Sequence, residues 1–547
     1  MSFSSTAAAK AAAPPPRGPQ LDRPVPGLAR WLFLGTLVGG FAYALLSVLG
    51  DTQSVGEQMG GAVIAFLVVA LLIALGFEFV NGFHDTANAV ATVIYTHAMP
   101  APLAVFWSGL FNFLGVMFSS GAVAYSIITL LPVELILNVG SNAGFAMIFA
   151  LLLAAVLWNV ATWYVGLPNS SSHALIGSIL GVGFANQIIA GGTSGTSGVD
   201  WSQAQKVLSA LLVSPMIGFF GAILLLLAMR ALLRNPALYR APEGEAPPPT
   251  GIRALLIFTC TAVSFTHGSN DGQKGMGLIM LILIGCAPTA YALNRTLDDA
   301  QTPKLVAQAE AAAGAFAAHG GDVRLPLASA RDQLASALKT KSAEGAEIQA
   351  ALATVSRETA RALRTAGTMA KLSPGTIQSV RTDMYLALDA SKLALKAPNA
   401  KFTETEKTAI TDYQHGLEGA TRYIPMWVKV AVAIALGLGT MVGWKRIVVT
   451  VGERIGKSHL TYGMGAVAEL VTAMTITLAE RFGLPVSTTH ILSSGVAGAS
   501  VANGAGLQAR TIRNMVLAWV MTLPATIALS GGLYWLFLTV ARAIGTA

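Results

Sequence analysis

The chain has 547 residues, of which 54% are hydrophobic and 11% are charged, whereas about a quarter of the residues are charged in an ordinary globular protein. This composition excludes an ordinary soluble domain and indicates an all-α, polytopic membrane protein. The net charge of +8 does not indicate a nucleic-acid partner, because the basic residues cluster in short segments beside apolar stretches, at 230–240 and 445–457. Basic loops of this kind mark the cytoplasmic face of a membrane protein.

The N-terminal region contains a polar tail and a first apolar stretch. Residues 1–28 are rich in alanine and proline and contain Lys10, Arg17 and Arg23, so we expect a disordered cytoplasmic tail. Residues 29–49 are apolar, longer than the core of a signal peptide, and followed by no convincing cleavage site. We therefore predict an extra N-terminal transmembrane helix, with the N-terminus in the cytoplasm.

Further apolar stretches recur along the chain between residues 61 and 540. Each is close to the ~20 residues that cross a bilayer as a helix, so we expect about 10–12 transmembrane helices in total. The protein is predicted to be a multi-pass protein of the inner (cytoplasmic) membrane, with the lipid bilayer around it.

One phrase occurs twice, as GLPNSSSH at 166–173 and as GLPVSTTH at 483–490. Proline at the beginning of a helix, followed by Ser or Thr where free N–H groups need capping, is typical of a helix start. Within a membrane, such a re-entrant start presents unpaired N–H groups, hydroxyl groups and the positive end of the helix dipole. Each phrase therefore predicts half of an anion site that needs no formal positive charge.

The side chains of this predicted anion site are hydroxyl groups at matching positions of the two phrases. They are Ser170, Ser171, Ser172, Ser487, Thr488 and Thr489. The alternative is that these hydroxyls only satisfy the backbone or pack between helices, as small residues do in membranes. His173 and His490 end the phrases, and they either orient the loops or act directly on the substrate or on a proton.

A second, weaker pair of phrases is NGFHDTANAVA at 81–91 and HGSNDGQKGMG at 267–277, which aligns Asp85 with Asp271 at an offset of 186 residues. The GLP phrases align at an offset of 317, so the offset grows by 131. Residues 294–424 are rich in alanine, carry charges of both signs and have the pattern of amphipathic helices. A soluble insertion of this length accounts for the whole change in offset.

The predicted organisation is therefore two homologous membrane halves with an insertion inside the second. The basic segment at 230–253 places the start of the second half in the cytoplasm, while the first half starts outside. The halves are then inverted repeats with discontinuous helices, an arrangement that places a substrate site near mid-membrane between the repeats. The expected segments are the tail 1–28, the helix 29–49, the first repeat 60–235, a cytoplasmic linker 236–250, the start of the second repeat 251–293, a periplasmic helical insertion 294–424, and the rest of the second repeat 425–545.

The second pair of phrases places carboxylates inside apolar sequence. A charged side chain at the centre of a membrane helix costs ~2.5 to 3.5 kcal/mol on insertion scales, so such a residue is a functional candidate. Carboxylate and amide oxygens suit a hard cation, and a carboxylate can instead carry a proton. The candidates for coupling to a cation or proton are Asp85, Asp271, Asn81, His84, Glu78 and Glu469. The alternative is an ion pair of Asp85 or Asp271 with Lys274 that only locks helices together.

An anion site beside carboxylates makes energetic sense for uptake by symport. Moving one negative charge inward against an inside-negative potential costs ~2.3 kcal/mol per 100 mV. Co-transported cations cancel this cost and also neutralise the carboxylates while the anion lies nearby.

The four phrases together closely resemble the inorganic phosphate transporter (Pit) family, especially its bacterial low-affinity members. The resemblance covers about 60–290 and 425–545, and the motifs stand in the right order. It implies symport of inorganic phosphate with protons or sodium ions, and in the bacterial branch transport as a neutral complex with a divalent metal such as Mg²⁺. It implies no bound cofactor and no enzymatic activity, and a homodimer is left open.

Carried across residue by residue, the resemblance assigns the two Ser/Thr triplets to phosphate binding. It also matches the family signature at Asp85, Asn88, Asn270 and Asp271, and we count Asn88 and Asn270 as phosphate ligands. His84 stands where many sodium-coupled relatives have Asn, which favours protons. The resemblance says nothing about the insertion or the N-terminal tail.

Three alternatives stay open. Hydroxyl and N–H donors also suit sulfate or another tetrahedral oxyanion. A membrane enzyme acting on phosphate-containing substrates finds no support in the form of a nucleophile and base pair, a Walker loop or metal-ligand spacing. A phosphate sensor or receptor that signals through residues 294–424 is the third alternative.

Overall fold

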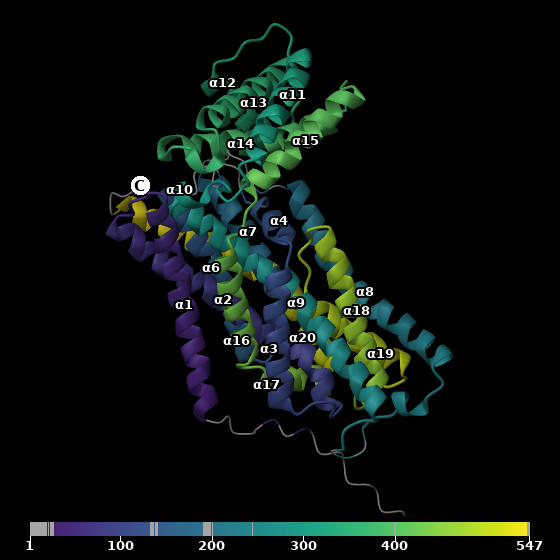
Figure 1. Ribbon diagram of the computed structural model, residues 1–547. Coiled ribbons are helices and arrows are strands. Elements are labelled where there is room, and N and C mark those ends of the chain that lie inside the picture. The colour runs from purple at the N-terminus through teal and green to yellow at the C-terminus, as the bar shows by residue number, and fades with distance from the viewer. Residues whose placement is uncertain are drawn as a thin grey trace, which may run out of the picture.

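The computed structural model describes residues 19, 21, 27–131, 136, 140–189, 199, 201–242, 244, 246–398 and 401–543, without the side chains of residues 86–88 and 202. Within these residues every named element is a helix. Figure 1 shows a tall membrane part with a smaller helical bundle at one end, and α1 (Gly27–Ser54) running along one side of the membrane part.

The first half of the membrane part contains seven further elements. They are α2 (Gly61–Tyr95), α3 (Ala101–Phe118), α4 (Ala122–Ile128), α6 (Asn142–Tyr164), α7 (Ser171–Ile189), α8 (Trp201–Leu232) and the short η1 (Pro236–Tyr239). The second half begins with α9 (Thr250–Cys286) and α10 (Pro288–Tyr291). It continues after the bundle with α16 (Met426–Thr440), α17 (Lys445–Glu453), α18 (Tyr462–Arg481), α19 (Thr488–Ala502) and α20 (Ala509–Ala543).

Eight of the described helices are long and apolar enough to cross a membrane: α1, α2, α3, α6, α7, α8, α18 and α20. The bent pair of α15 (Glu404–Thr421) and α16 would make a ninth if it formed one span. The chain is thus a multi-pass helical membrane protein. The sequence predicts 10–12 spans partly because the polar phrase HGSNDGQKG divides the residues of α9 into two apolar stretches. In the structure these residues form one continuous helix of 37 residues.

Helices α2 and α9 run unbroken through their polar motifs, so the glycines there serve close packing instead of loosening the helix. A Cβ atom at Gly268 of α9 would collide with the Asn112 carbonyl of α3, and one at Gly115 of α3 would collide with the Phe265 carbonyl of α9. Small residues let membrane helices approach in this way. The two helix backbones therefore meet next to the polar segment of α9.

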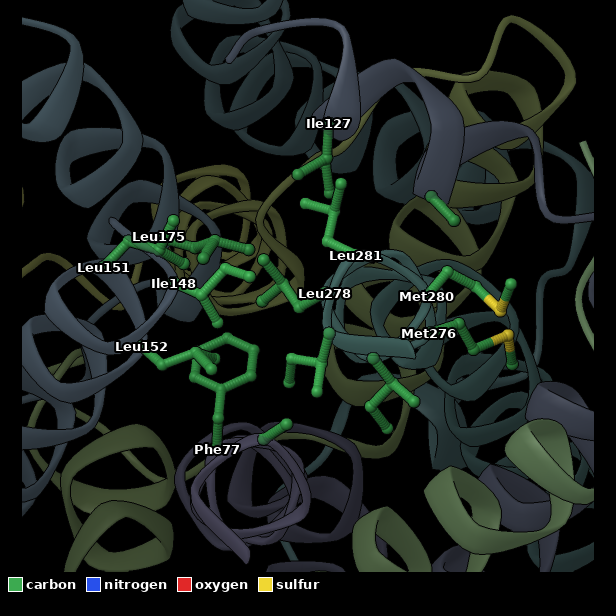
Figure 2. Close-up of a cluster of buried hydrophobic side chains, with 14 of the residues drawn as sticks. Phe77, Ile127, Ile148, Leu151, Leu152, Leu175, Met276, Leu278, Met280 and Leu281 are labelled. Carbon is green, nitrogen blue, oxygen red and sulfur yellow. The ribbon is translucent and has the colours of Figure 1, made fainter. Parts of the chain in front are cut away.

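The insertion-facing side of this segment is apolar. Figure 2 shows Leu278 and Leu281 of α9 in one cluster with Phe77 of α2, Leu152 of α6 and Leu175 of α7. The residues of α9 in this cluster follow Asp271 along the helix. They fill the space between Asp271 and the bundle with close-packed side chains.

The bundle consists of α11 (Gln301–His319), α12 (Leu327–Thr340), α13 (Ala346–Ala366), the short η2 (Met369–Lys371), α14 (Pro374–Lys396) and α15. Its apolar residues form a cluster of their own, with Leu305, Phe316, Leu352 and Ile377 buried. Arg331 of α12 donates two hydrogen bonds, of 2.6 and 2.7 Å, to the Asp383 carboxylate of α14. Figure 1 places the bundle at the end of the membrane part opposite α17.

Candidate functional site

Two short helix starts form the centre of the site. α7 begins at Ser171 and α19 at Thr488, as the GLP phrases predict. Ser170 Oγ accepts a hydrogen bond from the backbone N–H of His173 at 3.1 Å and pairs with the ring Nδ1 of the same residue at 2.9 Å. Ser487 Oγ accepts from the backbone N–H of His490 at 3.2 Å. The first hydroxyl of each triplet therefore caps its helix, and the next two are left to face the interior.

The two helix starts lie against each other. Ser172 Oγ donates to the Val486 carbonyl of the second phrase at 2.7 Å. The rings of His173 and His490 have centroids 4.5 Å apart. Both helix dipoles therefore present their positive ends to one small region of the interior.

The chain reaches the two starts from opposite ends of the membrane part. The Tyr164 carbonyl at the end of α6 accepts a hydrogen bond from Arg446 of α17, at the lower end in Figure 1. Phe482, which precedes the second phrase, lines a cavity with Leu338 of the bundle at the upper end.

Asp85 of α2 lies between the two helix starts. Its Oδ2 accepts from Ser171 at 2.7 Å, and its Oδ1 accepts from Thr489. Ser171 Oγ also lies 2.6 Å from Asn81 Oδ1, so its single hydroxyl hydrogen serves two acceptors. His84 Nδ1 is 3.5 Å from the Asp85 carboxylate. Asp85 is 3% exposed. Its carboxylate accepts hydrogen bonds from Ser171 and Thr489, two of the hydroxyl groups that the sequence predicts to bind an anion.

Asp271 of α9 has a different environment from Asp85. Its Oδ2 is 2.6 Å from Lys274 Nζ, and Lys274 also donates to Ser172 Oγ at 2.5 Å. The ion pair with Lys274 is therefore present for Asp271 and absent for Asp85 among the described residues. Lys274 connects the second carboxylate to the first helix start, and all three side chains are buried.

His267 connects the two carboxylates and was not among the residues proposed from the sequence. Its Nε2 lies 3.5 Å from Asp271 Oδ2 and 4.0 Å from Asp85 Oδ2. Its Nδ1 pairs with Asn112 Oδ1 at 2.7 Å, which fixes the ring. One ligand atom from each of Asp85, His267 and Asp271 lies within 4.8 Å of the others, so the three residues could together hold a cation or a proton.

Glu78 and Glu469 lie to either side of this centre, and Glu78 is linked to it because Asn81 Nδ2 donates to Glu78 Oε2 at 3.3 Å. Glu78 accepts from the Gly275 N–H at 2.6 Å, on one side of the centre, and Glu469 accepts from Thr92 and Thr259 on the other. Glu78 and Thr92 each stand seven residues from Asp85 along α2, which is about 10 Å in a helix. Both carboxylates are buried and lie near opposite ends of the polar interior, so their direct role beside Asp85 stays a prediction.

The other candidates lie at the edge of the centre. Asn270 Nδ2 donates to the Leu484 carbonyl at 3.2 Å, and its Oδ1 has no hydrogen-bond partner among the described residues. The side chain of Asn88 lies outside the described residues. His490 stacks on Trp519 with centroids 4.1 Å apart.

Three further residues contact the site but were not proposed from the sequence: Glu480, Asn112 and Thr162. Glu480 accepts from Ser269 Oγ at 2.7 Å and from Gln273 Nε2 at 3.0 Å, which stand two positions before and two positions after Asp271 on α9. Thr162 Oγ1 pairs with His84 Nε2 at 3.3 Å. Glu480 stands three residues before the second GLP phrase, and this adjacency was the only sequence signal for it.

Together, the fold and the site define a multi-pass helical membrane protein whose polar and charged side chains converge in its interior, as in a membrane transporter. Residues 81–530 match the phosphate transporter family, and the chain belongs to this family.

The chain is 41% identical to the low-affinity inorganic phosphate transporter PitA of Escherichia coli (strain K12), over 86% of this chain and 96% of that protein. It is 39% identical to PitB of the same organism over the same shares. A probable low-affinity inorganic phosphate transporter of Bacillus subtilis (strain 168) is 27% identical, over 86% of this chain and 96% of that protein. These relatives are named as transporters and not as enzymes.

Among solved structures, the sodium-dependent phosphate transporter matches 87% of this chain and all of its own, with 19% identity and a TM-score of 0.48.

Proposed function

We propose that this protein takes up inorganic phosphate by symport with protons, through alternating access about the centre formed by α2, α7, α9 and α19. Support comes from the family and from one observation above all: a buried carboxylate, Asp85, accepts hydrogen bonds from both helix starts. Phosphate is the anion in the names of the relatives.

The position of Asp85 suggests how a proton and phosphate are coupled. While Asp85 is ionised, it takes the Ser171 and Thr489 hydroxyls, and hydrogen bonds to an ionised acceptor are about twice as strong as neutral ones. A proton on the carboxylate weakens both bonds and removes a negative charge beside the incoming anion. The hydroxyls and helix N–H groups are then free to bind phosphate, so binding of the proton favours binding of the anion.

A proton suits this centre better than sodium. His84 and His267 lie within 4.0 Å of the Asp85 carboxylate, and hard cations are bound through oxygen ligands. A sodium ion, or a divalent metal carried with phosphate as a neutral complex, would neutralise the same carboxylates and is the alternative. Sulfate is the alternative anion.

Orientation and repeat symmetry form a second part of the proposal. α2 and α9 are antiparallel, since Glu78 contacts Gly275 while Thr92 and Thr259 share Glu469. Lys445 and Arg446 begin α17, which lies near the lower end in Figure 1, where a cytoplasmic face is expected. We infer two inverted repeats, a cytoplasmic N-terminus, an inner-membrane location and a periplasmic bundle.

The test is uptake of radiolabelled phosphate into proteoliposomes that contain the purified chain. An imposed proton gradient or sodium gradient is applied, with and without Mg²⁺, and with excess unlabelled sulfate. Uptake that requires the proton gradient and ignores sulfate is expected. Uptake that depends on the sodium gradient would change only the proposed coupling ion, from protons to sodium. If unlabelled sulfate competes as well as unlabelled phosphate, the site is not selective for phosphate and the proposed anion is wrong. No uptake under any gradient would refute the proposed function.

A further inference from the structure

A cavity of about 810 Å³ lies between the bundle and the upper end of the membrane part. Its walls come from α4, α8 and the end of α18 on one side and from α12 and α14 on the other. We call it the basic cavity because seven of its lining residues are basic: Lys206, Lys339, Lys341, Lys392, Lys396, Arg422 and Arg481.

The charge of this cavity is strongly unbalanced. Asp389 is the one acidic residue among the described lining residues. Lys392 and Arg422 pair with Glu418 at 2.6 and 2.9 Å. Lys206, Lys396 and Arg481 have no ion-pair partner among the described residues, and all three side chains are exposed to the cavity or to solvent. A concave surface lined by one sign of charge concentrates ions of the opposite sign.

The basic cavity adjoins the second GLP phrase. Phe482 and Gly483 form part of its wall, and Ser487, the cap of α19, stands four positions after Gly483 along the chain. A chain segment of this length spans at most about 14 Å. The part of the cavity wall formed by Gly483 is therefore within about 14 Å of the helix start that contributes to the central site.

A polar network separates the cavity from the centre. Gln273 Nε2 donates to Glu480, and its Oε1 accepts from the Val123 N–H of α4 at 2.9 Å. Glu480 also accepts from Ser269, next to Asn270 and Asp271. An anion that passes from the cavity to the centre therefore has to pass this network and the Glu480 carboxylate in it, which requires the network to rearrange.

We propose that the basic cavity is a second phosphate site, an antechamber that concentrates free inorganic phosphate from the side of the bundle before it enters the central site. This inference rests on the proposed function for its ligand. A free anion fits better than a lipid headgroup, because Lys339, Lys341 and Lys396 come from the soluble bundle and extend the basic lining away from the membrane part. No residue of the central hydrogen-bond network contributes a basic group to it.

The test replaces the three unpaired basic residues in the cavity variant Lys206→Gln/Lys396→Gln/Arg481→Gln. The matched control, Lys304→Gln/Arg357→Gln/Lys371→Gln, removes the same charge from exposed positions of the bundle outside the cavity lining. Initial rates of phosphate uptake are measured against phosphate concentration at low and high ionic strength. Vesicles of phosphatidylcholine are used, with and without phosphatidylglycerol.

We expect the cavity variant to raise KM by about tenfold at low salt with kcat unchanged, which is the low end of the tenfold to thousandfold gain that charged clefts give. The difference should shrink at high salt, where exposed charges are screened. The control variant should match the parent. Equal KM values for the cavity and control variants would overturn the proposal. An effect seen only with phosphatidylglycerol present would also overturn it, by showing that the cavity binds lipid headgroups.

Equilibrium dialysis with radiolabelled phosphate makes the test independent of transport. The parent and the control should show a weak class of phosphate binding, suppressed by salt, that the cavity variant lacks. Its absence from the parent would overturn the antechamber even if uptake is normal. A parent that shows this binding but no uptake would refute the proposed function and leave the cavity as an anion site.

Discussion

The two copies of the GLP phrase have the same sequence pattern and the same cap, but their hydroxyls are used differently. In the first copy, the hydroxyls of Ser170, Ser171 and Ser172 all have partners. In the second copy, Ser487 caps the helix and Thr489 donates to Asp85, while Thr488 Oγ1 and His490 Nε2 have no hydrogen-bond partner among the described residues. All three hydroxyls of the first helix start are thus paired, whereas the second helix start retains a buried hydroxyl without a partner among the described residues.

The carboxylates differ in the same way. Asp85 is held by hydroxyl groups, and Asp271 is held by Lys274. Because Lys274 aligns with Asn88, the repeat that supplies Asp271 also supplies a buried positive charge. The comparison suggests that the charge of Asp85 changes during transport, whereas the charge of Asp271 is balanced permanently by the Lys274 ammonium. Four substitutions test this asymmetry.

Asp271→Asn should have the largest effect, and the effect should be on stability. It leaves the Lys274 ammonium buried without its carboxylate, and breaking a buried pair costs about 3–5 kcal/mol. Thermal unfolding in detergent should show a large drop for Asp271→Asn and recovery in Asp271→Asn/Lys274→Met, which removes both charges. If Asp271→Asn unfolds at the parent temperature, the ion pair does not neutralise this carboxylate.

Ser171→Ala should lower phosphate uptake by about tenfold or more, since a hydrogen bond to a charged group is worth about 1.5–3 kcal/mol. Ser178→Ala on the same helix is the matched control, because Ser178 is buried but donates to its own helix at the Ala174 carbonyl. Uptake rates of the two variants are compared at equal amounts of folded protein. Equal rates would contradict a role for the first helix start in binding.

Thr488→Val should raise the thermal stability slightly and weaken phosphate binding. A buried, unpaired hydroxyl costs about 1–3 kcal/mol, and a methyl group of the same shape removes this cost, while losing a donor to the substrate costs about 1 kcal/mol, or about fivefold in KM. Thr472→Val is the control, because the Thr472 hydroxyl donates to the Ala468 carbonyl of its own helix at 2.7 Å. Unchanged KM in Thr488→Val would show that the free hydroxyl is not reserved for phosphate.

His490→Phe should have the smallest effect, less than about twofold in uptake, because an aromatic ring preserves the stacking on Trp519. His173→Phe should cost more, since it removes the hydrogen bond between His173 Nδ1 and Ser170 Oγ. Uptake measured across pH in both variants checks this order. Abolished uptake in His490→Phe would instead make His490 a proton carrier.

Much of the site could be predicted from the sequence because its signals are local. A GLP phrase with Ser or Thr caps specifies a helix start whatever surrounds it, and Asp85 is conspicuous in an apolar stretch. The contacts of His267 and Glu480 depend on how α2, α9 and α18 pack, which no local pattern contains. The polar segment of α9 is buried against α2, α3, α4 and α18, so the continuity of this helix also depends on packing that no local pattern shows.

The most direct test of the account compares two activities of Asp85→Asn in proteoliposomes: accumulation of phosphate driven by a proton gradient, and exchange of external for internal phosphate without a gradient. Asparagine is uncharged and of similar size, so it leaves the helix starts available to phosphate but cannot bind the proton. We predict that exchange persists while gradient-driven accumulation is lost. Accumulation at the parent rate, or equal loss of both activities, would contradict the claim that Asp85 couples the proton to phosphate.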